Sequence, residues 1–119
     1  MKHCLVVDES PVIRKVVCHL LAEMKFYAEE AAENATALET CRVQMPDVVL
    51  ANLGKSGGLE FVRALRRDRA HKQPVIIASM IEHDADHIGQ ALAAGANEYV
   101  LKPFDRDGLK EKFAAAGLM

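Results

Sequence analysis

Several polar residues that could do chemistry each directly follow a short apolar run of the chain. They are Asp8 with Glu9, then Asn52, Ser79 and Lys102. Two carboxylates suit Mg²⁺, which binds one or two of them and keeps several waters. A lysine and a hydroxyl can hold phosphoryl oxygens by charge and hydrogen-bond donation. Exposure of strand ends to water would explain any one of these residues, but it explains all of them together much less well.

The apolar runs have the length and composition of strands, and helical patterns separate them. We expect strands at residues 3–7, 26–30, 48–51, 74–79 and 97–101. Between them, apolar residues recur at the spacing of one helical face. Ser10 before Pro11 predicts the start of the first helix, Asn34 is expected to cap the second, and Asp105 to cap the last. Gly95 is expected to end the fourth.

Five strands that alternate with five helices predict an α/β fold. Right-handed crossovers would place the strands in one doubly wound parallel sheet between two helical layers, a three-layer (βα)5 arrangement. Ligands of such sheets bind beyond the carboxyl ends of the strands. The polar residues after the apolar runs are therefore expected to meet at one edge of the sheet.

Length and composition restrict the class of protein. The chain has 119 residues, half of them hydrophobic, and a formal net charge of −2, which predicts one domain over residues 1–119 and no bulk attraction to nucleic acid or to an anionic membrane. No apolar run has the length of a membrane helix or of a signal peptide. Three cysteines without CxxC spacing argue against a disulfide framework or a zinc site. We therefore predict a cytoplasmic domain.

Five stretches of the chain resemble receiver domains of the response-regulator family, and most of all the single-domain chemotaxis type. They are LVVDES at residues 5–10, PDVVL at 46–50, GLEF at 58–61, PVII at 74–77 and AGANEYVLKPF at 94–104. The resemblance covers essentially the whole chain, and the last stretch is its most discriminating part. It implies a role in two-component signalling and the flavodoxin-like strand order 2-1-3-4-5.

The resemblance also implies roles for individual residues. For the metal, Glu9 would bind Mg²⁺ directly, Asp8 through water, and the carbonyl of Gly54 would stand at the place of the third protein ligand. The remaining positions concern the phosphoryl group and the switch: Asn52 at the place of the phosphoaccepting aspartate, Ser79 as the hydroxyl that moves to the phosphoryl group, Tyr99 as the aromatic switch residue, Lys102 as the phosphate contact, and Pro103 after a cis peptide bond.

The sequence departs from the family pattern at the acceptor. Asn52 is a neutral carboxamide with a delocalised lone pair, so acyl-phosphate formation at this position should fail. It also removes one negative charge, which should weaken Mg²⁺ binding. The glycine-rich segment that follows, residues 53–58, is shorter than the family's usual one, and two coincident departures favour natural divergence. We therefore expect a pseudo-receiver of a phosphorelay system that acts by docking to proteins.

Other interpretations remain open. An ordinary Mg²⁺-dependent phosphoreceiver carrying an engineered Asp-to-Asn change would give the same sequence. A small-molecule sensor, for example of nucleotides, could use the loop at residues 54–58 or a basic cluster composed of Arg63, Arg66, Arg67, Arg69 and Lys72. We expect no enzyme, because no general base is paired with a nucleophile. The expected partner is a sensor kinase or another signalling protein, bound through the fourth helix, fifth strand and fifth helix.

Overall fold

A parallel five-stranded sheet forms the centre of the molecule. In the computed structural model, which describes residues 1–54, 57–81 and 85–119, the strand order is β2-β1-β3-β4-β5, and neighbouring strands all run parallel. The strands are β1 (Lys2–Val7), β2 (Phe26–Ala31), β3 (Val48–Asn52), β4 (Val75–Met80) and β5 (Glu98–Leu101). The doubly wound fold and the order 2-1-3-4-5 are confirmed.

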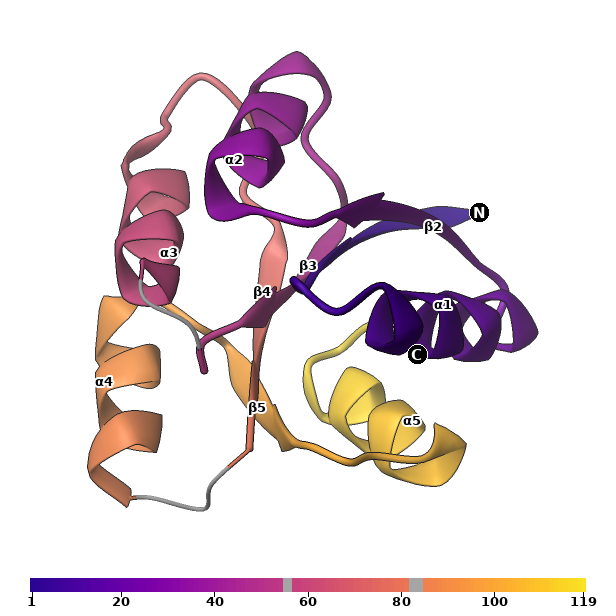
Figure 1. Cartoon of the computed structure of the whole chain (residues 1–119). Helices are drawn as coiled ribbons and strands as arrows, with labels where there is room; N and C mark the ends of the chain where they lie inside the picture. The colour runs from indigo at the N-terminus through magenta and orange to yellow at the C-terminus, as the bar shows by residue number, and fades with distance from the viewer. Residues whose placement is uncertain (55–56, 82–84) are drawn as a thin grey trace.

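Five helices cover the two faces of this sheet. They are α1 (Pro11–Glu23), α2 (Asn34–Val43), α3 (Gly58–Arg67), α4 (Ala85–Ala94) and α5 (Arg106–Ala115). Helices α1 and α5 lie on one face, and α2, α3 and α4 lie on the other (Figure 1). Because successive strand residues point to opposite faces, each strand contributes to two separate cores. In β1, for example, Cys4 packs toward α1 and α5, whereas Leu5 packs toward the other three helices.

The helix starts show how local sequence sets the element boundaries. The hydroxyl of Ser10 accepts a hydrogen bond from the backbone N–H of Ile13 at 3.3 Å, and Asp105 accepts one from Gly108 at 2.8 Å, as the sequence predicts. The expected cap at Asn34 is wrong. Glu33 takes the cap position, without a side-chain cap bond, and Asn34 is the first helical residue. No helix among the described residues is long and apolar enough to cross a membrane.

Candidate functional site

The carboxyl ends of the three central strands bring buried polar side chains together. Asp8 follows β1, while Asn52 and Ser79 lie on β3 and β4, where they are partners in the sheet register. Their exposed fractions are only 5%, 8% and 3%. These are the only polar or charged residues in the buried class within the described part of the chain, so the interior polarity is concentrated at one edge of the sheet.

Asp8 is held by contacts from three directions. The Nζ of Lys102 lies 2.6 Å from its Oδ2, and the backbone N–H of Ser10 donates to its Oδ1 at 2.9 Å. Arg14 of α1 donates to the backbone carbonyl of Asp8 at 2.6 Å and, through Nε, to Glu30 at 2.9 Å. The sequence pattern did not single out Arg14, because it reads as one more polar residue on an amphipathic helix. The acid pair is thus already partly neutralised by a protein cation.

Asn52 is held in one orientation by its own loop. The backbone N–H of Gly54 donates to the side-chain Oδ1 of Asn52 at 3.0 Å. Because a carbonyl oxygen must accept that bond, the amide nitrogen Nδ2 occupies the other side of the group. No described residue accepts a hydrogen bond from Nδ2, so a donor is available where the resemblance implies a carboxylate oxygen.

The donor set fits Mg²⁺ only in part. The carboxylates of Asp8 and Glu9 and the carbonyl of Gly54 are oxygen ligands of the right type, and all three residues line the same pocket. However, the Oδ2 of Asp8 already accepts from Lys102, and no group of three or more His, Cys, Asp or Glu ligands occurs among the described residues. A cation at this edge would have to compete with the lysine ammonium.

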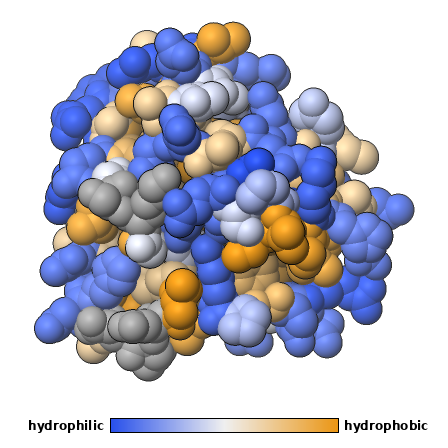
Figure 2. Space-filling model, viewed as in Figure 1, coloured by the Kyte–Doolittle hydropathy of each residue, from blue (hydrophilic) through white to orange (hydrophobic). Residues whose placement is uncertain are grey.

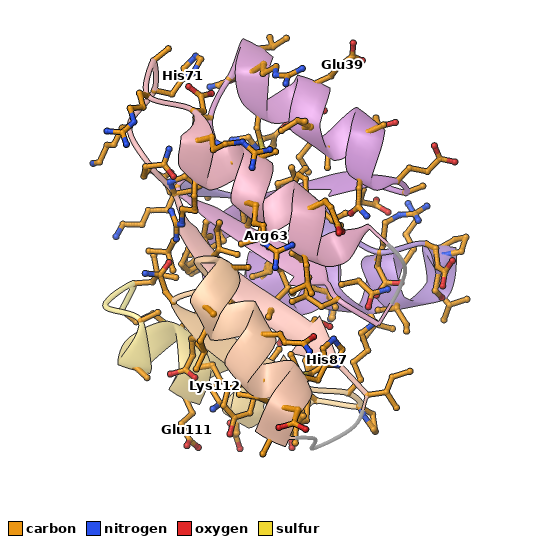
Figure 3. The ribbon with its side chains drawn as sticks, turned by 90° about the vertical axis from the view of Figure 1, so that its left-hand side faces the viewer. Glu39, Arg63, His71, His87, Glu111 and Lys112 are labelled. Carbon is orange, nitrogen blue, oxygen red and sulfur yellow. The ribbon has the colours of Figure 1, made fainter. Side chains whose placement is uncertain are left out.

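Tyr99 lies on β5, the outermost strand on one side of the sheet, between α4 and α5 (Figure 1). Its side chain is half-buried and packs against the core beneath α2, α3 and α4. The ammonium of Lys112 sits 4.0 Å from the centre of the Tyr99 ring and 3.4 Å from Glu98. Figure 3 shows Lys112 and Glu111 emerging beside the face of α4. The bond from Lys102 to Pro103 is cis, as the resemblance implies.

A pocket of about 460 Å³ opens directly from the polar edge. One end is formed by the polar residues described above. The rest of its wall is apolar and comes from the start of α1, from the residue after β4 and from the β5–α5 connection: Val12, Ile13, Val16, Val17, Ile81, Pro103 and Phe104. The sequence did not reveal this pocket, because α1 shows the same apolar stripe whether its residues pack inward or line a hollow.

Arg66 of the basic cluster is engaged by acceptors of the fold itself. Arg66 donates to the carbonyls of Gly95 and Pro74 at 2.9 and 2.8 Å and to the side chain of Asn97 at 2.7 Å. Burial lowers the pKa of this guanidinium. The central arginine therefore binds α3 to the loops around it. For the glycine-rich loop, residues 55 and 56 lie outside the described residues, so the structure does not test the expected anion site there.

Comparison with known proteins agrees with the fold. Residues 4–114 match the response regulator receiver domain family. The chain is 32% identical to the chemotaxis protein CheY of Pseudomonas aeruginosa over 91% of this chain and 90% of that protein. It is 28% identical to the phosphate regulon regulatory protein PhoB of Klebsiella pneumoniae, of which it covers 51%. The chemotaxis response regulator CheY4 of Vibrio cholerae superposes with a TM-score of 0.90, at 28% identity and 98% coverage of both chains. This chain belongs to the response regulator receiver domain family of two-component signalling.

Proposed function

We propose that this receiver domain acts by docking to other signalling proteins and that no acyl phosphate forms at position 52. The observation that carries the proposal is the carboxamide of Asn52 at the carboxyl end of β3, with its Oδ1 held by Gly54. A carboxylate attacks phosphorus as an anionic nucleophile, whereas a carboxamide is neutral. The edge where a phosphoryl group would attach therefore offers a hydrogen-bond donor in place of a nucleophile.

Mg²⁺ would be held weakly at this edge, by Asp8, Glu9 and the carbonyl of Gly54. The ion would supply positive charge for phosphoryl oxygens. Two features support weak binding: the missing carboxylate at Asn52, and the contact of 2.6 Å between Lys102 and Asp8, which already provides a counter-charge. If a phosphoryl group were bound at this edge, Lys102 and Ser79 would contact its oxygens. The state of the domain is then set by its partner, and only weakly by metal.

The proposed docking face is built from α4, β5 and α5. Leu92 of α4 is 45% exposed, although it is a large apolar residue. The Tyr99 ring on β5 and Lys112 on α5 are joined by the cation–π contact at 4.0 Å. A hydrophobic residue, an aromatic ring and a cation suit an interface with a sensor kinase or another signalling protein. In this proposal Tyr99 changes its packing when a partner binds.

The first test is phosphorylation from a small donor. The protein and its Asn52→Asp variant are incubated with Mg²⁺ and acetyl phosphate, and the intact mass is measured before and after hydroxylamine. We expect an adduct that hydroxylamine removes in the variant and none in the protein with Asn52. Such an adduct on the protein with Asn52 would overturn the proposal. If neither protein reacts, the phosphoryl site has lost more than its nucleophile, and absence of phosphotransfer is still supported.

The second test addresses docking. A photo-crosslinking amino acid is placed at Leu92 of the proposed face and, as a matched control, at Val43 of α2, an apolar residue that is 87% exposed. We expect position 92 to capture a signalling protein in cells, and equally so for the Asn52→Ala variant. Capture at position 43 alone, or capture that requires a phosphorylatable residue 52, would contradict phosphorylation-independent docking through this face.

A further inference from the structure

The polar edge of the sheet continues into an apolar hollow that the proposed function does not use. The pocket beside α1 has a volume of about 460 Å³, which lies in the range of roughly 300–1,000 Å³ found for small-molecule sites. Figure 2 shows hydrophobic surface gathered over the start of α1, beside this hollow. Mostly apolar walls with a few polar groups at one end are the usual composition of a ligand site.

Three apolar side chains of the wall are more exposed than packing in the core would leave them. Val12, Val16 and Ile81 have exposed fractions of 72%, 53% and 69%. Val12 and Val16 are four residues apart and so lie on the same face of α1. Single exposed apolar residues need no explanation, but here they line one hollow together with Phe104. A ligand with an apolar body would remove this surface from water.

The polar end of the pocket favours an uncharged head group. The buried charges of Asp8 and Lys102 already compensate each other at 2.6 Å. An added anion would meet the carboxylate of Asp8, and an added cation would meet the ammonium of Lys102. Asn52, by contrast, is an uncharged lining residue of the pocket, and no described residue accepts a hydrogen bond from its amide nitrogen. A carbonyl oxygen is the complementary partner of that donor.

We propose that this pocket is a binding site for a neutral amphipathic small molecule. The ligand has an alkyl or aromatic body that packs on Val12, Val16 and Phe104, and a carbonyl head that accepts from the Nδ2 of Asn52. The substitution that removes the nucleophile then also provides the donor for the ligand. The site shares no residue with the docking residues Leu92, Tyr99 and Lys112, which lie on α4, β5 and α5.

The test uses three probes with the same tail and different heads: octanamide, octanoate and octylammonium. Binding is followed by chemical-shift changes in the ¹⁵N and methyl spectra of the full chain, below the concentration at which the probes aggregate. We expect octanamide to bind in preference to both charged probes. The side-chain amide of Asn52 and the methyls of Val12 and Val16 should shift together. Preference for a charged probe, or no binding of any probe, would overturn the proposal.

Variants separate the pocket from nonspecific contact. Val16→Glu places a charge in the apolar wall at an already exposed position, and we expect octanamide affinity to fall by about tenfold or more, or about 1.4 kcal/mol. Val43→Glu, at an exposed valine of α2 remote from the pocket, is the matched control and should bind as the natural sequence does. Asn52→Asp removes the amide donor and should also weaken binding.

Equal affinity in all variants would show nonspecific association. If no probe binds and a partner protein instead covers Val12 and Val16, this surface is a protein interface and the ligand-site proposal is wrong.

Discussion

The ammonium of Lys102 lies 2.6 Å from the Oδ2 of Asp8, and the two side chains are only 11% and 5% exposed. This buried ion pair joins the loop after β5 to the end of β1 across the polar edge of the sheet. Removing one partner of such a pair leaves an uncompensated charge, which costs far more than the pair itself contributes. The polar edge therefore depends on both residues at once.

Lys102→Met should destabilise the domain strongly. It leaves the carboxylate of Asp8 buried without its counter-charge, for which we expect a loss of about 3 kcal/mol in the free energy of unfolding at neutral pH. The double variant Lys102→Met with Asp8→Asn removes the stranded charge and should recover most of that loss. Urea unfolding measures both. A single variant as stable as the natural protein would mean that the pair contributes nothing.

Mg²⁺ should affect the same variant more than the natural protein. In Lys102→Met the ammonium no longer competes for Asp8, so a divalent cation can provide the missing positive charge. We expect added Mg²⁺ to raise the unfolding temperature of Lys102→Met clearly and that of the natural sequence little. An equal response of both proteins would show that Lys102 does not compete with the metal.

Arg66→Lys should destabilise the fold away from the site. Arg66 donates to Gly95, Pro74 and Asn97 through a planar fork that a lysine cannot reproduce. We expect a loss of about 2 kcal/mol, because partly buried acceptors lose their donors. Arg67→Lys, at the exposed next residue, is the control and should change stability by no more than about 0.5 kcal/mol. Similar losses in both variants would argue against this role of Arg66.

The cysteines should differ in their reaction with iodoacetamide at mildly alkaline pH. Cys4 and Cys41 are fully buried, and burial raises the pKa of Cys41 to about 11 and that of Cys4 further still. Cys18 is half-buried, and its pKa is raised mainly by burial too. Since the thiolate is the reactive form, we expect slow labelling of Cys18 alone in the native protein and of all three in urea. Early labelling of Cys41 would reveal local opening of α2.

Acid should weaken the link between α1 and β2. The hydrogen bond from Arg14 at 2.9 Å holds the pKa of Glu30 below its usual value of 4.5. A carboxyl whose pKa is lower in the folded state stabilises the fold above its unfolded pKa, and this contribution is lost as pH falls through the folded value. Above pH 4.5 we therefore expect the natural protein to be more stable than Glu30→Gln, by less than about 1 kcal/mol. This difference in the free energy of unfolding should shrink as the pH falls below 4.5. Glu39→Gln on α2 is the exposed control, and a pH-independent difference for Glu30→Gln would contradict the prediction.

Local pattern was sufficient to predict the elements. Alternation of apolar runs and helical stripes depends on neighbours a few residues apart, and so do the caps at Ser10 and Asp105, which the structure confirms. At Asn34 the local signal was ambiguous by one residue, and the backbone carbonyl of Glu33 accepts the first helical bond from Ala37. The rule that parallel strands end at one edge then brought Asp8, Asn52 and Ser79 together without coordinates.

The amino-acid sequence by itself thus determined the fold class, the family and the residue types at the polar edge. The tertiary structure decided how those residues are used. Lys102 reaches Asp8 across 94 positions of the chain, and Arg66 binds the carbonyl of Gly95 across 29. Whether Val12 packs inward or lines a hollow depends on how α1 sits against the β5–α5 connection. These are distances between residues far apart in sequence, which periodicity cannot encode and only the packed chain defines.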